Sequence, residues 1–153
     1  MIVLVDTGPL GLVTNPRATA HNVACRLWAT SLASAGIRVL VPEIGDDELR
    51  REVIRVHRQR GIAYLDRLGA TGGYVPLTTV ALRRAAPLWA QARQIGTPTA
   101  PDLALDGDVI LAAQALVLAV QEADQDVIAT TNPGHLQRFA PAEEWSHVQP
   151  PSP

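Results

Sequence analysis

The sequence has a single cysteine, no lysine and few charged residues, which make up 18% of its 153 positions. One cysteine, Cys25, excludes a disulfide framework and a zinc site built from cysteines, as is usual in a reducing cytoplasm. The chain also opens on a strand-like run and shows no basic leader that would signal export. We therefore expect a cytoplasmic protein.

A strong net charge and a long hydrophobic run are also missing. The formal net charge is −2, which gives no general attraction to nucleic acids, so any RNA contact needs a local basic patch. The longest apolar run, residues 109–120, is interrupted by Gln114 and falls short of the roughly 20 residues that span a bilayer, so we expect no membrane contact. The length and the 47% hydrophobic content fit one domain over residues 1–148, followed by a Pro-rich tail at residues 149–153.

Strand-like and helical patterns alternate along the chain. Short runs of β-branched and aliphatic residues predict strands at residues 2–5, 38–41, 74–77, 127–130 and 145–148. Helical spacing of apolar residues predicts helices at residues 15–35, 43–59, 62–68, 79–95 and 106–121. Strands that alternate with helices form right-handed βαβ units, so we expect a three-layer α/β/α sandwich with a mainly parallel central sheet.

Asp6 ends the apolar run at residues 2–5, where a buried carboxylate is costly unless it serves a cation or a hydrogen-bond network. A Gly-Pro pair at positions 8 and 9 is expected to turn the chain out of the sheet, toward a helix that begins near Asn15. Active sites of α/β proteins lie at this edge, beyond the carboxyl ends of the strands. We interpret Asp6 as a metal ligand; the simpler alternative is that it caps the following turn.

Two further acids are expected to reach the same edge. Glu48 lies four residues after Ile44 on a predicted helix, so its side chain borders the inward face; a surface position is the simpler alternative. Asp106 and Asp108 begin a helix that is apolar nearly all round and must therefore be buried, although acids are favoured at any helix start. Because residues two apart do not share a helix face, we expect only one to face the site and choose Asp108.

Several carboxylates brought together repel one another unless they are protonated or a cation neutralises them. Polar groups of the loop at residues 130–135 are expected at the same edge. Hard oxygen ligands in the absence of cysteine favour Mg²⁺ or Mn²⁺. The sequence therefore predicts a magnesium or manganese site.

A local basic patch is present beside the acids. Five arginines cluster on the helix predicted after the second strand: Arg50, Arg51, Arg55, Arg58 and Arg60. This cluster is a candidate nucleic-acid contact. The alternative is a solvated helix face or a dimer contact.

These features occur in the order of a known family: a strand followed by Asp6 and Thr7, the helix of Glu48, an Asp-x-x-[Ile/Leu]-Ala-Ala stretch at Asp108, and a late Thr-Thr-Asn loop at Asn132. The chain resembles the PIN-domain ribonucleases, close to the VapC-type toxins of prokaryotic toxin–antitoxin modules. The resemblance implies a PIN-like domain in which the first three acids bind Mg²⁺ or Mn²⁺. The metal would activate a water that cleaves an RNA phosphodiester.

The chain departs from the family at the fourth acid, whose position holds His135. Asn132, Asp106 or His135 itself would have to supply a weaker ligand there. The resemblance also implies a homodimer and a cognate antitoxin that inserts into the acidic site. Next to such a site, Arg51 and Arg55 acquire a role as contacts for the phosphates of an RNA substrate.

Two other classes of function stay open. A non-catalytic PIN-like binding or assembly module would keep the acids for structure, and the missing fourth acid favours it. A magnesium-dependent phosphatase is the third class, but the segment after Asp6 lacks a second, alternating Asp, and no lysine is present to pair with phosphate. A metal titration separates the first two classes, because a binding module should bind Mg²⁺ or Mn²⁺ weakly or not at all.

Overall fold

Five parallel strands form the centre of the protein. The computed structural model describes residues 1–71 and 73–150. The strand order is β3-β2-β1-β4-β5, and every neighbouring pair is parallel. The strands are β1 (Ile2–Val5), β2 (Arg38–Pro42), β3 (Tyr74–Val75), β4 (Asp126–Thr130) and β5 (Ala142–Glu144).

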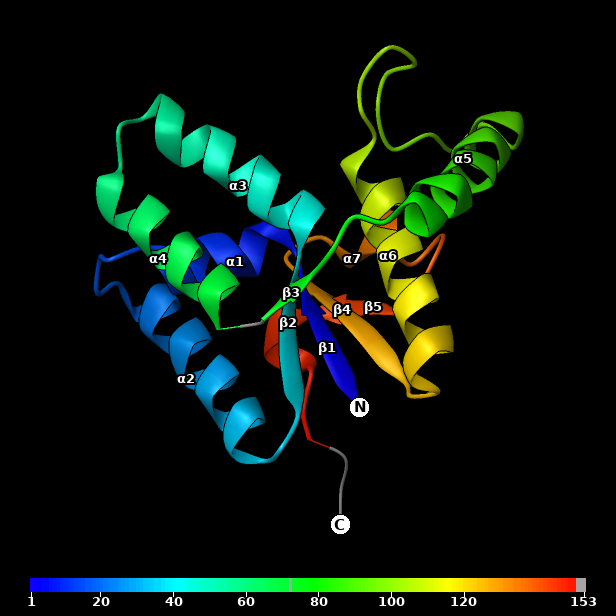
Figure 1. Ribbon diagram of the computed structural model, residues 1–153. Helices are drawn as coiled ribbons and strands as arrows, with labels where there is room; N and C mark the ends of the chain where they lie inside the picture. Colours follow the sequence, from blue (N-terminus) through cyan, green and yellow to red (C-terminus); the bar gives the residue numbers. More distant parts are fainter. Residues whose placement is uncertain (72, 151–153) are drawn as a thin grey trace.

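Helices cover both faces of this sheet (Figure 1). One layer holds α1 (Thr7–Thr14), α2 (Ala20–Ser34), α3 (Glu43–Arg55) and α4 (Gln59–Ala70). The other layer holds α5 (Thr79–Gln94), α6 (Gly107–Glu122) and the short α7 (Pro133–Leu136). The expected three-layer α/β/α sandwich with a parallel sheet is therefore confirmed.

The central strand β1 contributes to two hydrophobic cores, because alternate side chains of a strand point to opposite faces of the sheet. Ile2 and Leu4 are buried with the residues of α6, whereas Val3 and Val5 are buried with those of α1 and α2. Half of the residues of α6 are also buried, in an unbroken run from Val109 to Ala115 and at Leu118, which accounts for its nearly unbroken apolar sequence. Because β1 is covered on both faces, the residue that follows it is held at a fixed point of the carboxyl edge.

The helix expected at residues 15–35 was wrong in its start, because α2 begins only at Ala20 and a separate helix, α1, precedes residue 15. The first begins directly at Thr7, whose N–H donates to the capping side chain of Asp6 at 2.6 Å. Pro9 fits into the first turn because the N–H groups there have no partner within the helix. The Gly-Pro pair thus belongs to α1, which ends before Asn15.

The helix expected at residues 43–59 ends earlier, at Arg55. His57 takes a left-handed backbone conformation with a φ of 55°, and the N–H of Arg58 donates to the carbonyl of Val53 at 2.8 Å. Helices often end in this way, but usually with glycine at the left-handed position. Here no glycine or proline marks the end, and α4 begins just beyond this corner.

The strand expected at residues 145–148 was also wrong, because the chain forms a 3₁₀ turn there and β5 precedes it. The apolar character of Trp145 comes instead from an edge-on contact with Trp28 of α2, with ring centroids 5.5 Å apart. Strand β3 is shorter than expected, since Pro76 has no N–H to donate to a neighbouring strand.

The remaining elements follow the sequence closely. α5 and α6 agree with the helices expected at residues 79–95 and 106–121 to within one residue at each end, and Pro87 lies inside α5. The Pro-rich tail was expected at residues 149–153, of which residues 151–153 lie outside the described part of the chain. In the described ranges, no helix combines the length and the apolar character that crossing a bilayer requires.

Candidate functional site

Asp6 lies at the carboxyl end of β1 and makes contacts in two directions. Its Oδ1 accepts a hydrogen bond from the N–H of Thr7 at 2.6 Å and thereby caps α1. Its Oδ2 accepts one from the hydroxyl of Thr130 at 2.6 Å, and Thr130 is fully buried at the end of the neighbouring strand β4. Asp6 is therefore a helix cap and also an acid fixed at the sheet edge, and its role as a metal ligand stays a prediction.

Glu48, in the second turn of α3, is turned toward the sheet edge. Its Oε2 accepts a hydrogen bond from the hydroxyl of Thr7 at 2.7 Å. A methyl group added at Gly107 would overlap Oε1 of Glu48, so this carboxylate also lies against the first residue of α6. The half-buried side chain thus joins α1 to the start of α6, and the surface interpretation of Glu48 does not hold.

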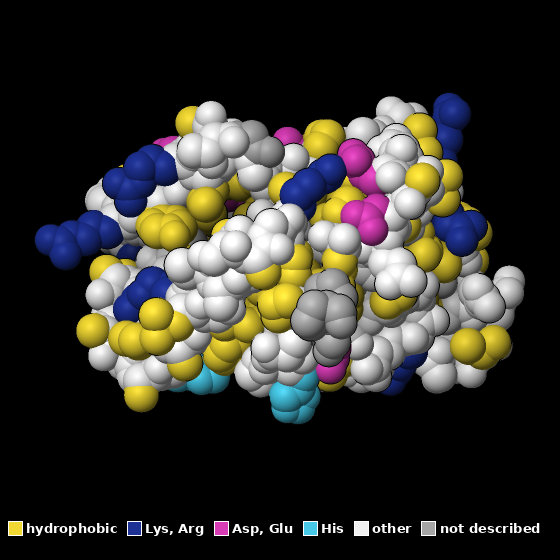
Figure 2. Space-filling view, turned by 90° about the horizontal axis from the view of Figure 1, so that it is seen from below, with side chains coloured by type: hydrophobic (Ala, Val, Ile, Leu, Met, Phe, Trp, Pro, Cys, Tyr) yellow, Lys and Arg dark blue, Asp and Glu magenta, His cyan; other side chains and the backbone are white. Residues whose placement is uncertain are grey.

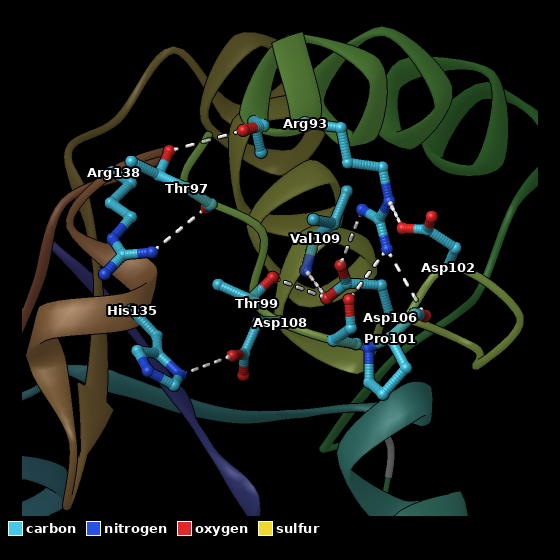
Figure 3. Close-up of polar contacts among 12 residues, drawn as sticks. Arg93, Thr97, Thr99, Pro101, Asp102, Asp106, Asp108, Val109, His135 and Arg138 are labelled. Carbon is cyan, nitrogen blue, oxygen red and sulfur yellow. Dashed lines mark hydrogen bonds and ion pairs between the residues drawn. The ribbon is translucent and has the colours of Figure 1, made fainter. Parts of the chain in front are cut away.

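Asp108 lies in the first turn of α6, and its carboxylate is directed toward α7 (Figure 3). Its Oδ2 is 3.2 Å from Nδ1 of His135, the residue found in place of the fourth acid. The Asp108 side chain is 32% exposed and that of His135 is 45% exposed, so solvent reaches the pair. Because Gly107 contacts Glu48, the acids of α3 and α6 meet at this end of α6.

Asp106 faces away from the other acids, into the loop between α5 and α6 (Figure 3). It caps α6, accepts a hydrogen bond from the Thr99 hydroxyl at 2.7 Å and pairs with Arg93 at 3.5 Å. Arg93 also stacks on Trp89 and pairs with Asp102 at 3.0 Å, so one guanidinium fastens the loop to the helix start. Asp106 therefore serves the fold, whereas Asp108 faces α7, and the choice of Asp108 as the metal ligand stays a prediction.

Burial and mutual repulsion act on the acids together. The pKa of Glu48 is raised, first by burial and then by the charges of Asp6 and Asp108, and a hydrogen bond from Thr7 opposes this rise. The pKa of Asp108 is raised by burial and by the charge of Asp6, against the opposing contact with His135. Each of these carboxylates therefore disfavours the charge of its neighbours, a cost that a bound cation would relieve.

Glu48→Gln is expected to change how the stability of the metal-free protein depends on pH. The pKa of Glu48 is higher in the folded than in the unfolded state. Its contribution to stability is therefore present below the ordinary pKa of about 4.3 and is lost as the pH rises through the raised pKa. The variant has no such loss, so its Tm minus that of the wild type should increase over this window.

Thermal melts in EDTA between about pH 4 and pH 8 measure this difference. The matched control is Glu143→Gln, which makes the same change at an exposed position of β5. If Glu48→Gln and the wild type lose stability in parallel as the pH rises, neither burial nor the neighbouring charges raise the pKa of Glu48 appreciably.

The donor set fits a hard divalent cation in its chemistry, because carboxylate oxygens are the ligands that Mg²⁺ and Mn²⁺ prefer. As the side chains stand, no three His, Cys, Asp or Glu residues among residues 1–71 and 73–150 are grouped closely enough to hold a metal ion. Each acid is held by its own partner, a threonine hydroxyl for Asp6 and Glu48 and His135 for Asp108. A cation would have to draw the carboxylates away from these contacts.

Gly107 was not marked by the sequence analysis, and Thr7 and Thr130 entered it only within a motif and a loop, without a role of their own. Thr7 and Thr130 each donate a hydroxyl to an acid, and Gly107 leaves the space in which the Glu48 carboxylate lies. Their places in the sequence were the available signal. Thr7 directly follows Asp6, Thr130 ends a predicted strand, and Gly107 stands between two aspartates. Asn132, a predicted weak ligand, is exposed at the start of α7, and its backbone N–H donates to the Thr130 hydroxyl.

The predicted arginine patch is divided by the corner between α3 and α4. Arg51 and Arg55 lie on α3, where they pair with Asp47 at 3.1 Å and with Glu52 at 2.6 Å. The last two arginines of the set lie beyond the corner, so the expectation of a single helix was wrong. On the face where the strands begin, opposite the acids, basic side chains lie apart from one another (Figure 2).

No protein-family model matches the chain, and no curated protein matches it in sequence. Its fold does match solved structures. FitAcB from Neisseria gonorrhoeae is 19% identical with a TM-score of 0.65, and the match covers 95% of this chain and 99% of that chain. VapBC2 from Rickettsia felis, bound to a DNA fragment from its promoter, is 16% identical with a TM-score of 0.64, and the match covers 94% and 98%. VapBC-1 from nontypeable Haemophilus influenzae is 18% identical with a TM-score of 0.65, over 95% and 99%.

These findings correct the assignment to the VapC-type toxins that the motifs suggested. The similar structures are toxin–antitoxin complexes that include FitAB as well as VapBC assemblies, all at 16–20% identity. A likeness this distant, shared by more than one kind of complex, does not single out VapC-type proteins. What it establishes is the fold, a PIN-like α/β sandwich with a parallel five-stranded sheet.

Proposed function

We propose that this protein is a metal-dependent endoribonuclease that cleaves RNA phosphodiesters at the carboxyl edge of its sheet. The observation that carries this proposal is the placement of Asp6, Glu48 and Asp108 at one edge of the sheet, where the charges of Asp6 and Asp108 add to the burial that raises the pKa of Glu48. Acids with perturbed pKa values at an accessible edge are typical of functional sites, and a cluster of carboxylates suits a divalent cation. The PIN-like fold supports the same class of activity.

In this proposal Asp6, Glu48 and Asp108 hold Mg²⁺ or Mn²⁺, which supplies a water of lowered pKa and offsets charge on the phosphate. Asp6 is the fixed point of the site, because the start of α1 and Thr130 hold both of its oxygens. Glu48 and Asp108 stand on two helices and approach from either side. The contact between Nδ1 of His135 and Asp108 orients that carboxylate.

A single cation is the simpler proposal for this site. Asp106 is occupied by Arg93 and Thr99, and His135 is in contact with Asp108. Asn132 is exposed and, among the described residues, its side chain contacts none of the acids. A second cation would therefore have to displace contacts that the fold or the first site uses.

Arg51 and Arg55 are the proposed RNA contacts on α3. Arg51 is 61% exposed and lies close enough to Glu48 for the two charges to interact. Its ion pair with Asp47 is also exposed, and such pairs are worth only about 0–1 kcal/mol, so a phosphate can replace the carboxylate. The Arg55 side chain is 71% exposed and continues the same side of the helix four residues further on.

We further propose that the protein forms a homodimer and acts as the toxin of a toxin–antitoxin pair, in which an antitoxin protein blocks the acidic edge. The structures similar in fold are toxin–antitoxin complexes. The layer of α5 and α6 leaves Val80 58% and Val120 83% exposed, and a second copy would cover such apolar side chains. Sedimentation of the pure protein measures dimerisation, and RNA cleavage before and after removal of a co-purifying protein tests the inhibitor.

The direct test of the nuclease is cleavage of labelled single-stranded RNA by the purified protein. We expect cutting with Mg²⁺ or Mn²⁺ and none with EDTA. If the protein cuts no RNA with either metal and binds neither, the non-catalytic PIN-like binding module replaces the nuclease as the better function. The hydroxyl groups that already hold Asp6 and Glu48 are the observation that favours this second candidate.

Gly107→Ala is expected to weaken metal binding without harming the fold. The added methyl group would overlap Oε1 of Glu48, and the end of this flexible side chain would move away from Asp108. Alanine itself favours a helix over glycine by about 1 kcal/mol, so the Tm should not fall. Loss of a residue that supports a metal ligand costs about 10- to 100-fold in metal affinity, and we expect at least this effect when the carboxylate of Glu48 is displaced.

Calorimetric titration with Mn²⁺, paired with thermal melts, measures both effects. Gly134→Ala is the matched control, since a methyl group there would meet only Asn132 Oδ1, at 3.9 Å. A variant at Gly107 that binds Mn²⁺ as tightly as the wild type would remove Glu48 from the proposed metal site.

A further inference from the structure

A cleft of about 340 Å³ opens beside the acids, between α1, α3 and the corner that joins α3 to α4. Figure 1 shows these three helices gathered on one side of the sheet. Gly11 and Glu52 line the cleft, and they lie four residues, about one helical turn, beyond Thr7 and Glu48. The cleft therefore continues the acidic edge along α1 and α3.

The floor of this cleft is apolar and its rim is basic. Leu49 and Val53 of α3 are buried and supply much of the apolar surface. Three arginines also line the cleft, Arg17, Arg58 and Arg60, and all three are exposed. Within residues 1–71 and 73–150, none of their guanidinium groups pairs with a carboxylate. The cleft thus offers three positive charges that the fold does not use.

The backbone holds two of these arginines in place. The carbonyl of Arg17 accepts a hydrogen bond from the side chain of Asn22, which is only 4% exposed, at 3.0 Å. The N–H of Arg58 donates to the carbonyl of Val53 at 2.8 Å, and its own carbonyl accepts from the N–H of Gly61 at 3.0 Å. The backbone of the rim is therefore fixed before a ligand arrives, which leaves only the arginine side chains to be ordered on binding.

The acid that lines the cleft does little to reduce its positive charge. Glu52 accepts two hydrogen bonds of 2.6 and 2.9 Å from Arg55 and also feels the charge of Arg58, but it is one acid against the three arginines of the rim. A ligand with an apolar part and negative charges therefore matches the cleft.

We infer that this cleft binds one unpaired nucleotide of the RNA, next to the phosphodiester that is cut at the acidic edge. The inference rests on the proposed nuclease function. Guanidinium groups match phosphate oxygens in pairs, and an apolar floor accepts the face of a base whatever its identity. The volume lies in the range of small-ligand sites, about 300 to 1,000 Å³. RNA is favoured over an acidic peptide because the cleft is continuous with acids that a phosphodiester has to reach.

The first experiment measures the binding of labelled oligouridine in EDTA, where no cleavage occurs. The double variant Arg58→Gln and Arg60→Gln is compared with Arg83→Gln and Arg84→Gln, which remove two exposed arginines from α5. In the cleft variant we expect weaker binding and a slope of log K against log salt smaller by about 0.7 for each lost phosphate contact. The α5 variant should bind as the wild type does, and both should keep the wild-type Tm.

The second experiment tests the apolar floor with small probes. Adenosine 5′-monophosphate and ribose 5-phosphate carry the same phosphate, but only the first has a base. We expect the nucleotide to bind about fivefold more tightly, the lower end of the effect of a base stacked on an aromatic side chain, because the floor of Leu49 and Val53 is aliphatic. Amide signals of Gly11 and Gly61, which line the cleft, should shift on titration with the nucleotide.

The inference is overturned if the cleft and α5 variants bind oligouridine equally well while the wild type still cleaves RNA, and the nuclease proposal then stands. It is also overturned if ribose 5-phosphate binds as tightly as the nucleotide, which would indicate a general anion site. Displacement of the nucleotide by poly-L-glutamate as readily as by oligouridine would indicate an acidic peptide instead. Failure of the nuclease proposal appears separately, as the absence of RNA cleavage by the wild type with either metal.

Discussion

Asp108→Asn is expected to abolish RNA cleavage while leaving the protein folded. Asparagine keeps the shape of the side chain and is tolerated in the first turn of a helix, but it removes a negative ligand from the cluster. The Asp108 side chain is 32% exposed, and its contact among the described residues is with the solvent-accessible His135, so no core contact is lost. Loss of a residue that only supports a metal ligand costs up to about 100-fold in activity. Loss of the ligand itself should therefore lower the cleavage rate by at least that factor.

The measurement is the initial rate of cleavage of single-stranded RNA with saturating Mn²⁺, together with the Tm of each protein. Asp66→Asn is the matched control, because it removes the same charge from a side chain of α4 that is 62% exposed. We expect the control to cut RNA at the wild-type rate. Equal rates for Asp108→Asn and the wild type would exclude Asp108 from the reaction and leave the acidic edge without its proposed function.

The architecture could be predicted because the buried elements have clear patterns. β1 is a short apolar run because it is the central strand of the sheet, and α6 is apolar nearly all round because it is buried between the sheet and α5. Their alternation with the other elements was enough for the parallel sheet and its layers. The acids could be predicted for the same reason, since Asp6 follows a buried strand and Asp108 begins a buried helix.

The details that failed depend on contacts distant in the sequence or on unusual backbone conformations. The end of α3 depends on His57 in a left-handed conformation, which the residue type does not announce. The last strand was misplaced because Trp145 packs on a helix, so its apolar character carried no information about a strand. α1 was missed because Pro9 was taken as a break, although proline is compatible with the first turn of a helix.

The arrangement around the acids could not be predicted from spacing along the chain. Asp6 meets Thr130 because β1 and β4 pair in a register that sets Val5 opposite Ala129, which places the next residue of each strand side by side. Glu48 fits against α6 because residue 107 is a glycine, a contact that crosses about 60 positions of the chain. Such contacts follow from the completed fold, so the sequence indicates which acids gather but not how each one is held.

Mn²⁺ or Mg²⁺ is expected to raise the Tm of the wild type, and Asp6→Asn should remove most of this gain. Binding to the native state alone stabilises a protein by about 2.7 kcal/mol at a ligand concentration of a hundred times Kd. For a domain of this size that corresponds to a rise of about 5 to 10 °C. The gain should be large for this cluster, because the cation also relieves the repulsion that raises the pKa of Glu48, beyond the effect of burial.

Asp6→Asn is a suitable test because the amide oxygen of asparagine can still cap α1, while its amide N–H can donate to the hydroxyl oxygen of Thr130, so the metal-free variant should fold normally. The charge is then the main property that changes. Melts with increasing MnCl₂, at ionic strength held constant with NaCl, separate specific binding from general screening of the acids. Asp66→Asn should keep the full rise in Tm. If Asp6→Asn responds to Mn²⁺ as the wild type does, the cation binds elsewhere and the cluster at the end of β1 is a structural network of caps and hydrogen bonds.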